Sequence, residues 1–184
     1  MIRLSVAFFI FIGLEAHSQN FPSEIDTSQY ARTMGEVIGK RSEGMYRYFE
    51  NGESDPFEGV LYAKYENGNY KSWQEYSAGV GQGQWINFYE NGNMEEWGTY
   101  IQNKVEGPIK KYHENGQLKA EGLYREWRVR VGKWKYYDTS GKFIKAEDYG
   151  KKGDLREVEA YYESGKISKS RYEFIVDSNQ KYGR

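Results

Sequence analysis

The chain has 184 residues, of which 38% are hydrophobic and 17% aromatic, with 21 glycines, 3 prolines and no cysteine. This aromatic content excludes a disordered chain, and the abundance of glycine predicts a thin β-sheet with many turns instead of a large compact core. The absence of cysteine excludes disulfides, thiolate metal sites, a cysteine nucleophile and a lipidated N-terminal cysteine.

Charge is distributed unevenly, although the formal net charge is only −1. Residues 19–100 contain 6 basic and 13 acidic side chains, whereas residues 101–184 contain 19 basic and 13 acidic ones. Such polarity favours an anionic partner for the second half. Neutral drift, or association between the opposite ends of two copies, explains it equally well.

The first 18 residues have the three-part form of a secretory signal peptide. Arg3 supplies a positive start, residues 4–14 form an apolar run, and Ala16 and Ser18 are small residues ahead of a cleavage site. The run is too short for a permanent transmembrane helix, and no other stretch could cross a membrane. We therefore expect cleavage after Ser18 and export to the periplasm, cell surface or medium, without integral membrane attachment. An uncleaved anchor is the alternative.

The rest of the chain divides into three parts. Residues 19–42 lack any repeat and are expected to form a linker or a degenerate capping strand. Residues 43–172 are expected to form a repeat array. Residues 173–184 form a polar tail that is expected to protect the last edge of the array.

Six turn-like triplets recur through the array, with glycines 16, 24, 24, 25 and 24 residues apart. They are Glu50-Asn51-Gly52, Glu66-Asn67-Gly68, Glu90-Asn91-Gly92, Glu114-Asn115-Gly116, Thr139-Ser140-Gly141 and Glu163-Ser164-Gly165. Asn-Gly favours a two-residue type I′ turn, in which both residues have positive φ. Each triplet is therefore predicted to close one β-hairpin, with looser loops at the last two.

The flanks of the triplets alternate with a period of two, which indicates strands. Apolar residues stand seven positions before each turn glycine: Met45, Leu61, Trp85, Ile109, Trp134 and Val158. Tyrosines stand eight positions after four of the glycines: Tyr76, Tyr100, Tyr124 and Tyr149. A two-residue loop then predicts that Trp85 lies opposite Gly98 and Ile109 opposite Gly122. A large side chain beside a glycine can lie flat over bare backbone and replace the missing second layer.

The pattern Gly-x-Trp-x-x-Tyr-x-x-Asn-Gly, followed by apolar-x-x-x-Gly-x-Tyr, resembles the MORN-repeat-variant family. The best copies are residues 83–100, 107–124 and 132–149. The resemblance implies an all-β fold, an elongated antiparallel meander of about six tandem β-hairpin repeats. Bacterial proteins that resemble this one are often labelled antitoxins of toxin–antitoxin systems, and eukaryotic members are linked to scaffolding and membrane lipids. These roles are analogies at the level of the fold.

No motif in the sequence predicts catalysis. His113 is the one histidine beyond the signal segment, and it stands where other repeats carry an aromatic residue, so we interpret it as a substituted repeat aromatic. The repeated glutamates lie at hairpin tips, where water prevents the raised pKa that a catalytic acid needs. Neither Gly-x-Ser-x-Gly nor a phosphate-binding glycine loop is present. We therefore expect no enzyme activity, no metal and no cofactor.

Two features depart from the repeat and are candidates for partner binding. An aromatic row, Phe57, Trp73 and Trp97, is predicted on the face opposite Trp85. It forms either an exposed binding stripe or a cross-strand cluster that holds the sheet together.

The second feature is the connection at residues 125–131, where Trp127 is flanked by Arg125, Arg128 and Arg130. Tryptophan and arginine are enriched at interface hot spots. With Lys110, Lys111, Lys133 and Lys135, these arginines form either a basic binding face or a solvated strand edge.

The leading hypothesis is an exported protein-binding or scaffold module, with an antitoxin-like immunity role as one form of it. The alternative is an envelope ligand binder that recognises glycan or anionic lipid through the aromatic row or the basic face. Nucleic acid is not expected as a partner, because the export signal removes the chain from it.

Overall fold

The computed structural model describes residues 31–161 and 167–171, and their regular structure consists of β-strands apart from one short 3-10 helix. Twelve strands form one sheet. They are β1 (Ala31–Thr33), β4 (Gly59–Lys64), β5 (Tyr70–Ser77), β6 (Val80–Phe88), β7 (Met94–Ile101), β8 (Lys104–Val105), β9 (Gly107–Tyr112), β10 (Leu118–Arg125), β11 (Val129–Tyr137), β12 (Phe143–Asp148), β13 (Glu157–Tyr161) and β14 (Ile167–Arg171).

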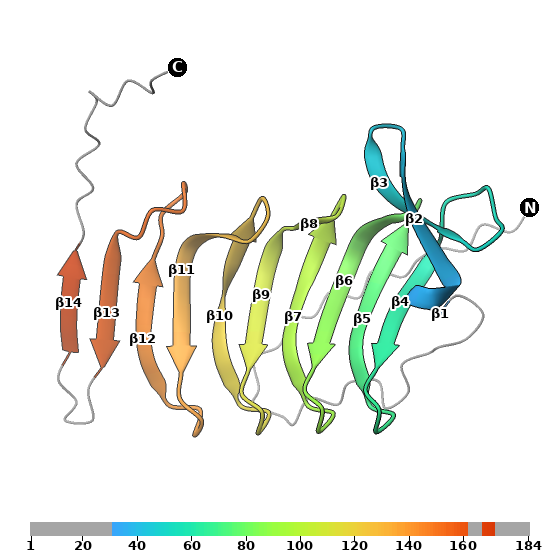
Figure 1. Ribbon diagram of the computed structural model, residues 1–184. Coiled ribbons are helices and arrows are strands. Elements are labelled where there is room, and N and C mark those ends of the chain that lie inside the picture. The colour runs from blue at the N-terminus through green and yellow to red at the C-terminus, as the bar shows by residue number, and fades with distance from the viewer. Residues whose placement is uncertain (1–30, 162–166, 172–184) are drawn as a thin grey trace, which may run out of the picture.

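A separate two-stranded sheet consists of β2 (Val37–Ser42) and β3 (Met45–Glu50), preceded by the short 3-10 helix η1 (Met34–Glu36). Figure 1 shows the main strands side by side in one open row, with the β2–β3 hairpin rising from it near β4–β6. Within the described ranges, no helix is long and apolar enough to cross a membrane.

The strand order confirms the predicted antiparallel meander of tandem hairpins. From β4 to β14 each strand pairs with its neighbour in sequence, with β8 as a short side branch on β7. β1 lies parallel to β4 and covers that edge of the row. Five hairpins lie in the main sheet, and β2–β3 is the sixth.

The first triplet does not close a repeat hairpin, contrary to the prediction. β3, which precedes Asn51 and Gly52, pairs with β2 and not with β4. The chain makes a tight turn there, in which the Glu53 N–H donates to the Glu50 carbonyl. It then forms a single bridge between Phe49 and Pro56 before it enters the main sheet.

The prediction of type I′ turns at the triplets is wrong. In the triplets, Gly68, Gly92 and Gly116 have positive φ, whereas the preceding asparagines do not. The Gly92 N–H donates to the Tyr89 carbonyl, and the Tyr89 N–H donates to the Asn93 carbonyl. This is a type I turn followed by a left-handed glycine, the three-residue hairpin loop. Paired positive φ angles occur instead between repeats, at Ala78-Gly79 and Gln102-Asn103.

The predicted register is nevertheless confirmed away from the turns. Trp85 pairs with Gly98 and Ile109 with Gly122. Nearer the turn the pairing shifts by one residue, so that Phe88 faces Met94. A bulge in β7 between these two regions offsets the longer loop and restores the expected pairs.

The triplet asparagines connect neighbouring turns, which explains their presence without positive φ. Asn91 Nδ2 donates to the Glu114 carbonyl of the next turn at 3.0 Å, and Asn91 Oδ1 accepts from the Asn93 N–H at 2.9 Å. Asn67 and Asn115 make the equivalent bonds to the carbonyls of Glu90 and Thr139. Successive hairpin tips are therefore tied in a ladder.

His113 takes part in a parallel ladder of repeat side chains. The hydroxyls of Tyr65 and Tyr89 donate to the carbonyls of Phe88 and Tyr112 in the next repeat. His113 occupies the equivalent position, and its Nε2 lies 2.9 Å from the Tyr137 carbonyl. This geometry confirms the interpretation of His113 as a substituted repeat aromatic.

The main core lies on one face of the sheet, which we call the tryptophan face. Trp85, Trp134 and Ile109 are almost completely buried there, and Val105 and Tyr124 complete the cluster. A Cβ added to Gly98 would lie 2.7 Å from Trp85 Cζ2, so the indole packs directly on bare backbone as predicted. A second cluster of Val37, Phe57 and Leu61 packs beside the β2–β3 hairpin.

Candidate binding site

A groove of about 560 Å³ opens between the β2–β3 hairpin and the ends of the first repeats on the tryptophan face. Five aromatic side chains line it: Tyr46, Tyr48, Tyr76, Tyr100 and Trp127. Its polar lining comes mainly from the β7–β8 connection, with Gln102, Asn103 and Lys104. A hollow of this volume, lined by aromatic rings, has room for a ligand.

Hydrogen bonds fix the hairpin that forms one wall of the groove. Asn103 Nδ2 donates to the Tyr46 carbonyl at 3.0 Å, while Asn103 Oδ1 accepts from the Gly81 N–H at 2.6 Å. The Tyr48 N–H donates to the Gly79 carbonyl at 2.8 Å. These bonds join β3 to two separate connections of the main sheet, so the groove is held open before any ligand arrives.

The tyrosine rings of the groove stand at right angles to one another. Tyr46 and Tyr48 have ring centroids 5.7 Å apart at an interplanar angle of 85°, and Tyr48 and Tyr76 are 5.4 Å apart at 84°. Burial raises the pKa of Tyr48, Tyr76 and Tyr100 above the usual value of a phenol. These hydroxyls are therefore uncharged at physiological pH and can both donate and accept hydrogen bonds.

The connection between β10 and β11 places Trp127 at the rim of the groove. Three consecutive residues, Glu126, Trp127 and Arg128, have positive φ angles of 39°, 63° and 70°. Non-glycine residues adopt this region at a cost of about 1 kcal/mol or more each, and such strain concentrates at functional sites. The Glu126 N–H donates to Glu106 Oε2 at 2.8 Å and anchors the turn. Trp127 is 63% exposed as a result.

The tyrosines eight positions after the turn glycines form one row, and two of the four lie beside an arginine guanidinium. Arg128 Cζ lies 5.8 Å from the Tyr124 ring centre and 5.0 Å from that of Trp85. Arg130 Cζ lies 5.7 Å from Tyr149 and 4.9 Å from Trp134. Tyr76 and Tyr100, the other two members of the row, face the groove instead.

Residues 82–102 and 105–126 match the family model of the MORN repeat variant. These two segments are similar to MORN repeats of the variant type. The two matched segments are the central repeats, built from β6–β7 and β9–β10. MORN repeats are in general protein-binding or membrane-binding modules and are not catalytic.

Comparison with other proteins adds no assignment of function to these MORN repeats. No curated protein matches the sequence. Solved structures of the GtfA/B complex bound to UDP and GlcNAc and of TarM align with 73% of the chain, at 11% and 15% identity. Their TM-scores are 0.25 and 0.30, and the chain covers 24% and 21% of their lengths. A likeness this low establishes neither fold nor function.

The predicted aromatic row of Phe57, Trp73 and Trp97 is divided between the two faces of the sheet. Phe57 is only 2% exposed and packs with Leu61 on the tryptophan face, so its expected place beside Trp73 and Trp97 is wrong. The reason is that the first triplet closes no hairpin, and counting from Gly52 therefore fails. Trp73 and Trp97 are half-buried and pair with Tyr62 and Ile86, as predicted.

The predicted basic face is likewise split and largely neutralised. Arg128 Nη1 lies 3.1 Å from Glu96 Oε1, and Lys111 contacts the same carboxylate at 3.1 Å. Lys135, on the opposite face, pairs with Glu121 at 3.2 Å. Arg125 is exposed at the end of β10. The arginines flanking Trp127 therefore do not form one continuous basic surface.

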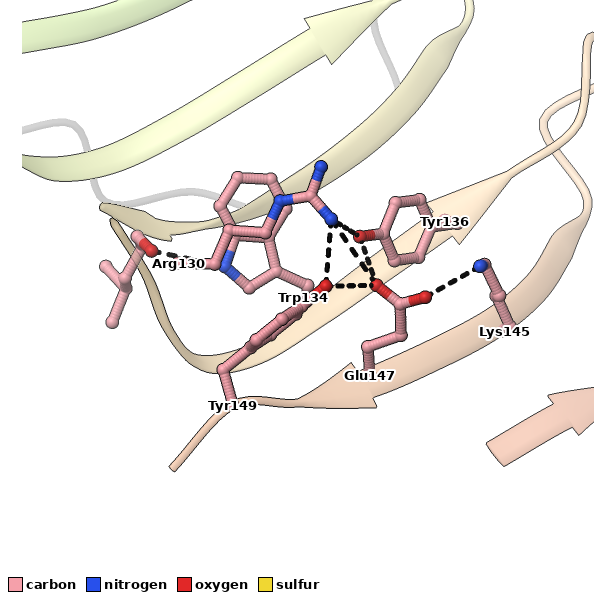
Figure 2. A network of polar contacts seen from close by, with 7 residues as sticks. Arg130, Trp134, Tyr136, Lys145, Glu147 and Tyr149 are labelled. Carbon is pink, nitrogen blue, oxygen red and sulfur yellow. Dashed lines mark hydrogen bonds and ion pairs between the residues drawn. The ribbon is translucent and has the colours of Figure 1, made fainter. Parts of the chain in front are cut away.

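Figure 2 shows that Arg130 belongs to an internal network on the MORN sheet. Its Nη1 donates to the hydroxyls of Tyr136 and Tyr149, and both hydroxyls donate to Glu147 Oε2. Lys145 completes the network at 2.7 Å from Glu147 Oε1. Burial raises the pKa of Glu147, but the hydrogen bonds from Lys145, Tyr136 and Tyr149 outweigh it and hold that pKa below its usual value. A carboxylate that is ionised at neutral pH and engaged at both oxygens is suited to a structural role and not to that of a catalytic acid.

Across the part of the chain that the structure describes, no group of three histidine, aspartate or glutamate side chains could hold a metal ion. Of the groove residues, the sequence singled out Trp127 as a binding residue and missed the tyrosines. Tyr76 and Tyr100 could have been found from the sequence, because both stand eight positions after a turn glycine. Nothing local indicated that Tyr46 and Tyr48 fold back over them.

Proposed function

We propose that this chain is an exported, non-catalytic repeat module that binds a protein partner through the aromatic groove. The observation that carries this proposal is the groove itself, with Trp127 held 63% exposed at its rim by a strained turn. An exposed tryptophan beside a preformed hollow is typical of an interface hot spot. The general role of MORN repeats as binding modules supports the same conclusion.

Affinity capture tests the proposal with two matched variants. Trp127→Ala removes the rim of the groove, whereas Ile144→Ala removes an exposed side chain, 41% exposed, away from it. We expect the wild-type chain and Ile144→Ala to retain the same partner from an envelope extract, and Trp127→Ala to lose it. Truncation of a hot-spot tryptophan costs about 2 kcal/mol or more, which is roughly a thirtyfold loss of affinity. Equal retention by all three proteins would refute the proposed site.

Arg128→Ala is not a suitable test of partner contact. Its guanidinium stacks on buried Trp85 and pairs with Glu96, so its removal perturbs the sheet itself. Loss of binding in that variant would not distinguish a contact from a structural change.

Export is a separate part of the proposal and rests on the N-terminal segment of the sequence. Expression in a bacterium, followed by mass spectrometry of the intact protein, tests it. We expect a mature N-terminus at Gln19 in the extracytoplasmic fraction. Recovery of the uncut chain in the cytoplasm would remove export from the proposal without affecting the groove.

The second candidate function is recognition of an envelope glycan. Uncharged phenols and an exposed indole can stack on sugar rings, which is the observation that favours it. Binding to anionic lipid has less support, because Lys111, Lys135 and Arg128 already contact carboxylates. Co-sedimentation with cell-wall polymer and with anionic vesicles at low salt tests both. An antitoxin-like immunity role is one form of the protein-binding proposal, and the identity of the captured partner decides it.

A further inference from the structure

The described residues contain many contacts between a cation and an aromatic ring, and none of them involves a ring of the groove. Lysine or arginine lies over Phe49, Tyr65, Tyr70, Trp85, Tyr124, Trp134, Tyr136 and Tyr149. Over the five groove rings, no cation of the described chain is in place. The groove is therefore a cluster of aromatic rings over which the described residues place no cation.

Equivalent positions in the other repeats indicate which cation would stack on the groove tyrosines. Tyr76, Tyr100, Tyr124 and Tyr149 occupy the same position in successive repeats. Tyr124 and Tyr149 each lie beneath an arginine guanidinium of the chain itself. Guanidinium is planar and weakly hydrated, so it stacks on aromatic faces more readily than ammonium does. Tyr76 and Tyr100 present the same ring with no guanidinium stacked on it. Burial raises the pKa of the Tyr100 phenol, and Arg128 lies near enough for its charge to offset that effect in part.

The attraction for a positive charge comes from the rings of the groove and not from the formal charge of its lining. No acidic side chain is among the residues that line the groove. Lys104 is the one formally charged side chain of the lining. The phenols of Tyr48, Tyr76 and Tyr100 stay neutral, because burial raises the pKa of each. Their electron-rich ring faces are then the main attraction for a positive charge.

We propose that the groove receives an arginine side chain of the protein partner, stacked among Tyr76, Tyr100 and Trp127. The inference rests on the proposed function and specifies the chemistry of the partner. Trp127 closes over the guanidinium from the rim, and the tyrosines take the places that Tyr124 and Tyr149 take beneath Arg128 and Arg130.

The experiment compares two blocked single-residue peptides, N-acetyl-arginine methylamide and its citrulline counterpart. Citrulline has nearly the same shape as arginine and no charge, so the pair isolates the cation. The full chain, as recovered from the expressing bacterium, is titrated with each peptide. The indole N–H resonance of Trp127, assigned by its absence in Trp127→Leu, is followed by NMR. We expect arginine to bind about tenfold more tightly than citrulline, since two or more rings contribute.

The variant Lys104→Gln tests whether the groove prefers a cationic or an anionic ligand. Removal of this positive charge is expected to strengthen arginine binding by about twofold to threefold, through loss of a weak repulsion near the surface. An anionic ligand would instead bind the variant more weakly. Tyr46→Leu, at an exposed ring of the lining, is expected to weaken arginine binding, whereas Ile144→Ala leaves it unchanged.

Equal affinity for arginine and citrulline, absence of a Trp127 shift with either peptide, or weaker arginine binding by Lys104→Gln would overturn the inference. None of these results changes the outcome expected of the affinity capture. A partner that is retained by the wild type and lost by Trp127→Ala, together with a failed arginine titration, would mean that the groove binds protein through another group.

Discussion

Alanine at Gly98 tests whether the sheet is stabilised by rings packed on bare backbone. A Cβ there would lie 2.7 Å from Trp85 Cζ2, 2.9 Å from Cε2 and 3.0 Å from Ile109 Cδ1. Carbon atoms prefer separations of about 3.5–4.0 Å, so the methyl group overlaps the indole by nearly 1 Å. Trp85 is completely buried and cannot swing outward, and the strand pairing holds Gly98 in place.

The expected cost follows from two opposing effects. Overpacking of a filled core destabilises by about 1–3 kcal/mol. Alanine also restricts the unfolded chain, which returns roughly 0.4–1 kcal/mol. Gly98 does not have positive φ, so no backbone strain is added. We therefore expect Gly98→Ala to lower the free energy of unfolding by about 1–2 kcal/mol.

Urea denaturation followed by far-UV circular dichroism measures this difference. Gly35→Ala is the control, because a Cβ there meets only Thr33 Oγ1 at 3.9 Å and the residue does not have positive φ. It should leave stability unchanged or raise it slightly. In a Trp85→Phe background, the smaller ring should abolish most of the Gly98→Ala cost, which a double-mutant cycle detects. A neutral Gly98→Ala, or a cost that persists beside phenylalanine, would refute the steric reasoning.

Two further predictions concern the ladder and the charged network. His113→Phe removes the contact with the Tyr137 carbonyl and should lower the free energy of unfolding, measured by urea denaturation, by about 1 kcal/mol. His113→Tyr restores a hydrogen-bond donor and should not lower it. Equal losses in the two variants would contradict the ladder. Glu147 has a lowered pKa, so its stabilisation is present above pH 4.5 and is lost as pH falls through its folded value. Glu147→Gln should therefore cost about 2 kcal/mol at pH 7 and flatten the stability profile below pH 4.5, and an unchanged acid profile would contradict the assignment.

The regular part of the fold was predictable because its information is local. Glycine spacing and alternating apolar residues determine strand positions, and they predicted the pairs Trp85–Gly98 and Ile109–Gly122 correctly. The turn type was not predictable in the same way. Asn-Gly is compatible with both the two-residue and the three-residue hairpin loop. The three-residue loop forms here, together with a bond from Asn91 to the Glu114 carbonyl, 23 residues away.

The binding groove could not be predicted, because it is formed by contacts between residues that are far apart in the sequence. The bond from Asn103 to the Tyr46 carbonyl joins residues 57 positions apart and brings the β2–β3 hairpin to the groove. The arginines beside Trp127 were expected to form either a basic binding face or a solvated strand edge, because Arg and Val alternate there. Two of them instead stack on rings of the tryptophan face, which an alternation of Arg and Val could not reveal.

The tie between hairpin tips has a consequence for how such arrays change in length. The triplets of Asn67, Asn91 and Asn115 each donate to a carbonyl of the following tip, and those of Asn91 and Asn115 also accept from the preceding one. An added Asn-Gly unit of about 24 residues therefore contains both halves of such a junction. Duplication or deletion of a unit beyond β11 would thus extend or shorten the sheet while the hairpin, the strained turn and the hollow between them stay intact. The length of the array and the identity of what it holds can evolve independently.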